Sequence, residues 1–127
     1  MTTLIYCAFA MMLLPYLAKI PVAIYQQKAG GYDNHLPRQQ QASLTGLGAR
    51  ALAAHQNTFE AAIMFAIAFA VAVATQNTGG TIQGLFIGFI VLRVLYCVLY
   101  WLDVSTLRSI VWGLALGCLL VVVGLSL

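Results

Sequence analysis

Long apolar runs dominate the pattern along this chain, and four of them are long enough to cross a lipid bilayer as helices. A helix needs about 20 predominantly apolar residues to span the hydrocarbon core, whereas a membrane barrel strand shows about 10 residues of alternating polarity. The pattern therefore predicts an all-α integral membrane protein that folds as a four-transmembrane-helix bundle in a single domain, residues 1–127. The predicted spans cover residues 4–25, 48–74, 81–101 and 107–127.

The first span contains two prolines, Pro15 and Pro21. Proline lacks the backbone N–H that a helix interior requires, so the sequence predicts a kink or an early end in this helix. No lysine or arginine precedes the apolar run, and the cations follow it. This order is unlike a cleaved signal peptide, so we expect the first helix to be retained.

The connections between the spans differ in length and charge. Residues 26–47 form a long polar loop with Lys28 and Arg38, the second connection is short and uncharged, and residues 102–106 lead directly to Arg108. The first and third connections lie on the same side of a four-span protein. The positive-inside rule places that side in the cytoplasm, so both termini are expected to face the periplasm or lumen.

Composition supports a membrane environment, because hydrophobic residues make up 62% of the chain and charged residues only 7%. Soluble domains have about 45–50% apolar and about 25% charged residues. These values exclude a soluble globule, a disordered segment and a nucleic-acid binder with a basic face.

The cysteines, Cys7, Cys97 and Cys118, lie in apolar runs without disulfide or zinc spacing, so we interpret them as packing residues.

Glycines at a spacing of four residues occur in the last two spans. Gly84 and Gly88 form one GxxxG step, and Gly113 and Gly117 form another. Small faces of this kind allow membrane helices to approach closely. We therefore expect tight packing within the bundle or in an oligomer.

Two charged residues lie deep inside the predicted spans. Glu60 is about 18 Å into the second span, and Arg93 is about 12 Å from Trp101 on the same side of the membrane, at 1.5 Å per residue. A charge in hydrocarbon costs at least about 2.5–3.5 kcal/mol on insertion scales, and such residues usually face a bundle interior or a wet cavity. Both positions are therefore candidates for function.

Helical geometry aligns further polar residues with this pair. At about 100° per residue, Arg50, Asn57 and Glu60 fall within one stripe of the second span, whereas His55 lies on another face. In the third span, a similar stripe contains Arg93, Tyr96 and Tyr100. Arg108 begins the fourth helix at the same membrane level.

A purely structural interpretation is open for several of these residues. Glu60 and Arg93 would neutralise each other as an ion pair between neighbouring helices. Tyr100 and Trp101 lie where interfacial aromatic belts occur. His55 would make a hydrogen bond between helices.

The functional interpretation is a polar pocket that opens to the cytoplasm and contains an excess of cations. Arginines offer bidentate donors to carboxylates, so Arg50, Arg93 and Arg108 suit the acidic groups of a ligand. Glu60 suits an ammonium group, and Asn57 suits the amides of a small peptide. No metal is favoured, because His, Cys and carboxylate side chains are not clustered at ligand spacing.

These motifs resemble the MAPEG family, the membrane-associated proteins in eicosanoid and glutathione metabolism. The main match is RALAAHQNTFE at residues 50–60, which resembles the Arg-x-x-x-Ala-His-x-Asn-x-x-Glu pattern of the family. A second match is Arg93-x-x-Tyr96-x-x-x-Tyr100, and YDNHLPR at residues 32–38 is similar to the first loop of bacterial members. The resemblance extends over the whole chain in length, span count and motif order.

The resemblance implies a homotrimer in a bacterial inner membrane, with glutathione as co-substrate bound between subunits near the cytoplasmic face. Arg108 would lie by the sulfur and favour the thiolate, which would attack lipophilic electrophiles from the bilayer. The implied activity is that of a glutathione transferase or peroxidase, with no metal and no nucleic acid. The residues implied in glutathione binding are Asn57, Glu60, Arg93, Tyr96, Tyr100, Arg50 and His55.

The sequence departs from the family at Ala53, where several members carry an arginine three residues after Arg50. Some family members bind lipids without catalysis, so a non-catalytic lipid-binding or scaffold protein is the alternative. A small transporter would need a polar path through all depths, and the periplasmic halves of the spans contain almost no polar side chains.

Overall fold

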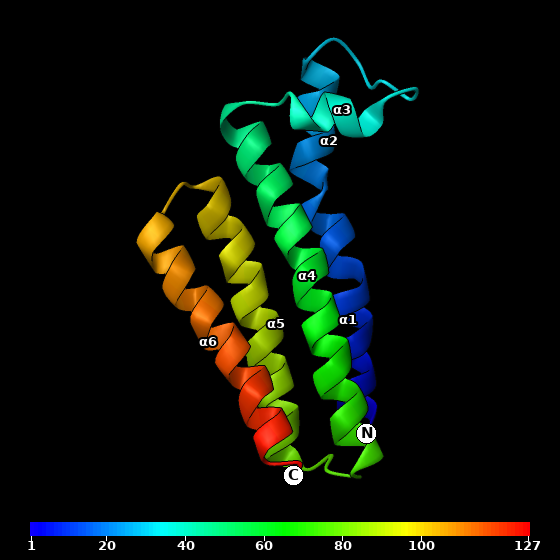
Figure 1. Cartoon of the computed structure of the whole chain (residues 1–127), viewed down its shortest axis with the longest axis vertical. Coiled ribbons are helices and arrows are strands. Elements are labelled where there is room, and N and C mark those ends of the chain that lie inside the picture. The colour runs from blue at the N-terminus through cyan, green and yellow to red at the C-terminus, as the bar shows by residue number, and fades with distance from the viewer.

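The computed structural model describes residues 1–127 and contains helices but no strands (Figure 1). Four helical stretches are long and apolar enough to cross a membrane, namely Thr2–Lys28, Gly46–Ala74, Gly80–Trp101 and Ser105–Gly124. The predicted all-α fold with four spanning helices is confirmed. The helices in chain order are α1 (Thr2–Ala18), α2 (Ile20–Lys28), α3 (Pro37–Ala42), α4 (Gly46–Ala74), α5 (Gly80–Trp101) and α6 (Ser105–Gly124).

The first span is divided at Lys19, where α1 ends and α2 begins. Pro21 follows this point and has no N–H to donate to the preceding turn. The Lys19 amide still donates to the Pro15 carbonyl at 3.1 Å, as in a continuous helix, and it also donates to the Tyr16 carbonyl at 3.1 Å. The division agrees with the early end that the prolines predict.

The predicted loop over residues 26–47 contains regular structure. α2 continues to Lys28, and the six-residue helix α3 lies within the connection. Gln26 of α2 holds α3 in place through two hydrogen bonds. Its Nε2 donates to the Pro37 carbonyl at 3.3 Å and to Gln40 Oε1 at 2.9 Å. Gln26 is 0% exposed, so these bonds also satisfy a buried polar group.

The spanning helices form two pairs, with α1 against α4 and α5 against α6 (Figure 1). The pairs pack closely in the half that holds both termini, around Phe65, Phe86 and Phe89. The Phe65 and Phe86 ring centroids are 5.0 Å apart. Toward the other end, α5 and α6 lean away from α4 (Figure 1). The two pairs therefore diverge in the half that contains the connections after α2 and α5 (Figure 1).

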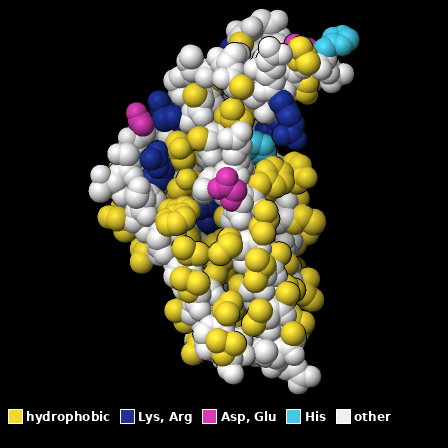
Figure 2. Space-filling view, in the orientation of Figure 1, with side chains coloured by type: hydrophobic (Ala, Val, Ile, Leu, Met, Phe, Trp, Pro, Cys, Tyr) yellow, Lys and Arg dark blue, Asp and Glu magenta, His cyan; other side chains and the backbone are white.

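Charged side chains gather in the half where the helix pairs diverge (Figure 2). The connections that follow α2 and α5 lie at this end, and both termini lie at the other (Figure 1). The half near the termini shows hydrophobic side chains and no charge on the face in view (Figure 2). A long apolar zone with a polar end is the distribution that a bilayer requires.

The GxxxG glycines do not mediate close helix contacts within the chain. A Cβ on Gly88 would be 3.9 Å from Cys118 Sγ, and a Cβ on Gly84, Gly113 or Gly117 would meet nothing within 4 Å. The expectation of tight packing through these residues is therefore wrong within the subunit. The close approach occurs at Gly48, where a Cβ would be 3.1 Å from Tyr25 Cβ.

Candidate functional site

Arg93 is the centre of the polar cluster and is only 1% exposed, although it carries a charge within a spanning helix. Its Nη2 donates to Asn57 Oδ1 at 2.9 Å and lies 3.5 Å from Thr58 Oγ1. Its guanidinium carbon lies 4.2 Å from the centre of the Tyr96 ring. Neutral oxygens and an aromatic face therefore hold this cation, with no carboxylate in direct contact.

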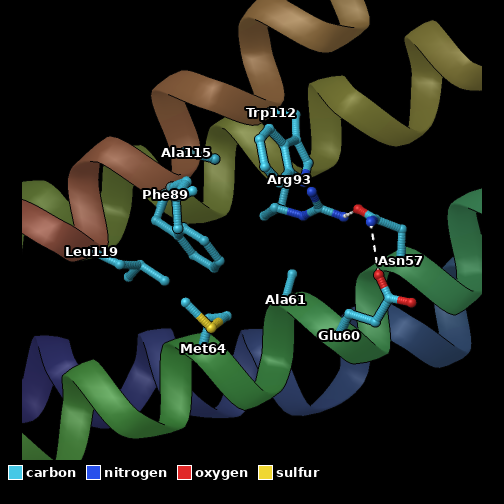
Figure 3. Close-up of a pocket in the computed structure, with 10 residues that line it drawn as sticks. Asn57, Glu60, Ala61, Met64, Phe89, Arg93, Trp112, Ala115 and Leu119 are labelled. Carbon is cyan, nitrogen blue, oxygen red and sulfur yellow. Dashed lines mark hydrogen bonds between the residues drawn. The ribbon is translucent and has the colours of Figure 1, made fainter.

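Asn57 connects the cation to the acid of the cluster (Figure 3). While its Oδ1 accepts from Arg93, its Nδ2 donates to Glu60 Oε2 at 3.0 Å. The direct Glu60–Arg93 ion pair of the structural interpretation is absent, because the amide lies between the two groups. The only side-chain ion pair within 4.0 Å is Arg50–Asp103.

A row of cations and aromatic rings continues from this cluster to α6. The Tyr96 and Tyr100 rings meet edge to face with centroids 5.6 Å apart. The guanidinium carbon of Arg108 lies 4.0 Å from the centre of the Tyr100 ring. The structure thus brings together the residues of the stripe predicted for the third span, namely Arg93, Tyr96 and Tyr100. Arg108, which was predicted at the same membrane level, joins them.

Two cavities adjoin this row. The first has a volume of about 190 Å³ between α4, α5 and α6, with polar groups on part of its wall and apolar side chains on the rest. The second, of about 220 Å³, contains Arg108 and the two tyrosines. The first is lined by Asn57, Glu60, Ala61, Met64, Phe89, Arg93, Trp112, Ala115, Leu116 and Leu119 (Figure 3).

The Arg93 side chain has donor capacity that the protein leaves unused. Its Nε is buried and has no hydrogen-bond partner. A buried donor without a partner costs about 1–3 kcal/mol, more when it is charged. Arg93 also lines the first cavity, so its guanidinium is the cation on the wall of that cavity.

Arg50 lies outside this cluster. Its Nη2 donates to the Trp101 carbonyl at 3.3 Å, and its Nη1 lies 3.8 Å from Asp103 Oδ2. These contacts join the start of α4 to the end of α5. The structure therefore separates Arg50 from Glu60, with which it shares a helix face.

His55 also points elsewhere. Its Nδ1 donates to the Pro15 carbonyl at 2.8 Å, and its ring packs edge-on against Phe59 at 5.2 Å. This is the hydrogen bond between helices of the structural interpretation. His55 lines a separate cavity of about 440 Å³ that also contains Lys19 and Arg38.

Two residues of the site were not among the sequence candidates. Thr58 is fully buried, donates to the Ala54 carbonyl at 2.7 Å and offers its oxygen to Arg93. Trp112 lines both cavities. Trp112 lies one helical turn after Arg108 on the same face of α6, but nothing else in the sequence distinguishes it from the apolar residues around it.

The fold and the site together define a class: a polytopic helical membrane protein with one buried arginine, Arg93, and two cavities between its spanning helices. The chain belongs to the MAPEG family, because it matches the model of that family over residues 3–127, essentially its whole length. The family includes glutathione transferases and related proteins. Comparison with curated proteins and with solved structures gave no match.

Proposed function

We propose that this protein is a membrane-bound glutathione-dependent transferase, or a peroxidase, in which a glutathione thiolate attacks lipophilic electrophiles from the bilayer. The supporting observation is the arrangement of Arg93, Asn57 and Glu60 beside one cavity and of Arg108 beside the next. Family membership supports the choice of glutathione over other small anions.

The charges of the cluster match those of glutathione, which has two carboxylates, an ammonium group and two amides. Glu60 is exposed, so its carboxylate is available to the ammonium group. Arg93 lines the same cavity, so its guanidinium would face an oxygen of the peptide bound there. Asn57 uses one Nδ2 hydrogen for Glu60, which leaves the second hydrogen for an amide carbonyl.

Arg108 supplies the cation that the chemistry requires. A free thiol has a pKa of about 8.5, and the thiolate is the nucleophile. A fixed cation favours the thiolate, and each pKa unit corresponds to about 1.36 kcal/mol. Arginine remains protonated, so Arg108 stabilises the anion while the thiol proton leaves to solvent. The sulfur then forms a bond to the electrophilic carbon, and the leaving group departs with its electron pair.

A homotrimer would complete the site. We propose that glutathione lies between neighbouring subunits, as in the glutathione-binding members that the sequence resembles. The open glycine faces of α5 and α6 provide surfaces where another copy can approach closely.

We also propose that the end carrying α3 faces the cytoplasm of a bacterial inner membrane. Lys28, Arg38 and Arg108 lie in or beside the connections at this end, and positive charge favours the cytoplasmic side. A reporter that is active only in the periplasm should be active when fused to the C-terminus. Activity of a cytoplasm-specific reporter there would reverse this orientation.

The proposed function is tested with the purified protein in detergent. Adding glutathione should raise the ultraviolet absorbance of the thiolate, and 1-chloro-2,4-dinitrobenzene should be converted to its glutathione conjugate. We expect Arg108→Ala to abolish the absorbance rise and to lower kcat at least tenfold. Lys28→Ala, which removes an exposed cation at the end of α2, is the matched control and should behave as wild type.

The second candidate is a non-catalytic lipid-binding or scaffold protein, favoured by the apolar part of the cavity between α4 and α6. It predicts binding of apolar molecules with neither a thiolate signal nor turnover. That combination, found in the wild-type protein, would reject the enzyme and support this candidate.

A further inference from the structure

A cavity of about 440 Å³ lies where the ends of α1 and α4 meet the connection that contains α3. Two cations line it, namely Lys19 from the break between α1 and α2 and Arg38 from the start of α3. At about 100° per residue, the α4 residues on its wall, which include Phe59, point away from Asn57 and Glu60. This Lys19–Arg38 cavity is therefore separate from the cluster of the proposed function.

The positive charge of the Lys19–Arg38 cavity is not neutralised by an acidic side chain. No carboxylate lines the cavity, and neither cation has a carboxylate within 4.0 Å. Asp33, the acid of the same connection, accepts instead from the backbone amides of His35 and Leu36 at 2.8 and 3.1 Å. The cavity therefore suits an anionic group.

The Lys19–Arg38 cavity lies at the level where the apolar part of the bundle ends. Residues 4–18 of α1 contain no charged side chain, and Lys19 is the first charged side chain of the sequence. The Tyr16 and Phe59 rings meet edge to face with centroids 5.8 Å apart, one turn before Lys19, and aromatic residues of this kind are typical of the membrane interface. α2 and α3 lie beyond this level (Figure 1). The two cations therefore lie at the depth of lipid headgroups.

An apolar groove continues from the cavity into the membrane between the same two helices. It has a volume of about 250 Å³ and only hydrophobic lining residues, which include Met12 of α1 and Ala62 of α4. Both lie one helical turn from the Tyr16–Phe59 contact. The groove reaches Phe69, about 15 Å from Phe59 along the axis. This length is about half of the 30 Å hydrocarbon core, so the groove extends through one leaflet.

We propose that this surface binds one anionic phospholipid, with its phosphate between Lys19 and Arg38 and one acyl chain in the groove between α1 and α4. Basic pockets between helices at a membrane surface bind anionic headgroups in this way. Tyr32 and Gln56 also line the cavity, and their side chains can donate to phosphate oxygens. A zwitterionic lipid has its own cation, which the two positive side chains would repel. The proposal does not depend on the proposed function, because it uses the other face of α4.

The test uses the purified protein, freed of native lipid, in an uncharged detergent. Dioleoylphosphatidylglycerol and dioleoylphosphatidylcholine have the same acyl chains and differ in headgroup charge. A ligand that binds the folded state raises Tm, so Tm is titrated with each lipid, and native mass spectrometry counts the bound molecules. We expect saturation by the anionic lipid with at least about tenfold higher affinity, since each cation contributes about fivefold. Equal affinity for the two lipids would overturn the proposal.

Charge variants locate the headgroup. Lys19→Gln and Arg38→Gln should each weaken phosphatidylglycerol binding about fivefold and leave phosphatidylcholine binding unchanged. Lys28→Gln is the matched control, because Lys28 is an exposed cation at the end of α2 that does not line the cavity. It should bind both lipids as wild type. An equal loss in all three variants would indicate attraction to general positive charge and would overturn the site.

A variant in the groove locates the acyl chain. Ala66 is exposed and lines the groove, so Ala66→Leu should weaken phosphatidylglycerol binding at least about threefold as the chain loses packing contacts. The ratio of the two lipid affinities should stay as in the wild type. Ala74→Leu, at an exposed residue of α4 outside the groove, is the control and should not weaken binding. Unchanged affinity in Ala66→Leu would overturn the placement of the chain.

Other occupants of this surface give different results. A site for soluble anions predicts that glycerol 1-phosphate or glutathione displaces phosphatidylglycerol and that Lys19→Gln weakens this competition. A second copy of the chain on this surface predicts that phosphatidylglycerol does not bind the wild-type protein and that Lys19→Gln lowers the assembly mass in light scattering. Either result would overturn the lipid site, whether or not glutathione is turned over.

Discussion

Replacing Asn57 by leucine tests whether the amide is what holds Arg93 in the membrane interior. The two side chains are similar in size, so the change removes polarity and little volume. Arg93 would lose its 2.9 Å bond from Nη2 and would retain only the 3.5 Å contact with Thr58. Glu60 would lose its 3.0 Å donor at the same time.

The expected loss in the free energy of unfolding is about 2 kcal/mol. Hydrogen bonds to charged groups contribute about 1.5–3 kcal/mol, and Arg93 is 1% exposed, so water does not replace the lost partner. Glu60 is exposed, and its share is therefore small. Hydrogen bonds in a membrane helical protein average about 0.6 kcal/mol in double-mutant cycles, so a loss of about 2 kcal/mol identifies a charged partner.

The assay is unfolding by SDS in mixed micelles, followed by circular dichroism. A double-mutant cycle with Arg93→Met isolates the pair. Once the cation is removed, Asn57→Leu should cost less than about 0.5 kcal/mol, which gives a coupling energy of at least about 1.5 kcal/mol. Gln56→Leu, which makes the same change at the preceding exposed residue, should stay within about 0.5 kcal/mol of wild type.

A coupling energy near zero would refute this reasoning. It would mean that water or another group satisfies Arg93 in the folded protein, and that the Asn57 contact contributes nothing to its burial.

Two further predictions concern the packing of α4. His55→Leu removes the bond to the Pro15 carbonyl and should lower the free energy of unfolding by about 1 kcal/mol in the same SDS titration; an unchanged midpoint would show that this bond does not join the helices. Gly48→Ala places a Cβ 3.1 Å from Tyr25 Cβ and should destabilise by about 1–3 kcal/mol, measured as a lower Tm. Gly80→Ala, at the first residue of α5, where a Cβ also meets nothing within 4 Å, should not lower Tm, and equal losses in both variants would contradict the packing argument.

The spanning helices were predictable from the long apolar runs. A segment that crosses lipid must satisfy its own backbone hydrogen bonds, and a long apolar run does so as a helix. The division of the first span was predictable from Pro15 and Pro21. The helix α3 was not, because it has only six residues and no apolar periodicity. Hydrogen bonds from Gln26 hold it in place, and such tertiary contacts leave no local pattern in the sequence.

The candidate site was predictable where helix geometry alone decides which residues meet. Arg93 and Asn57 lie on facing stripes, and the structure joins them. The rotation of about 100° per residue did not place Arg50 correctly, because it gives the direction of a side chain around the helix axis and not its position along that axis. Arg50 is about 15 Å along the axis from Glu60, and it bonds to the end of α5 instead.

The position of Trp112 beside both cavities could not be predicted, because it depends on how α6 packs against α4 and α5. An uncharged aromatic residue in an apolar run gives no sign that it lines a cavity. The cavities become apparent only when three helices are placed together.

Calorimetric titration of the purified protein with glutathione tests the central proposal most directly, namely that the cluster of Arg93, Asn57 and Glu60 binds this tripeptide. We predict saturable heat for the wild-type protein and at least tenfold weaker affinity for Glu60→Gln, because an interaction with a charged partner is worth about 1.5–3 kcal/mol and tenfold corresponds to about 1.4 kcal/mol. Absence of saturable heat in the wild-type protein, or equal affinity in the two proteins, would contradict the proposed site.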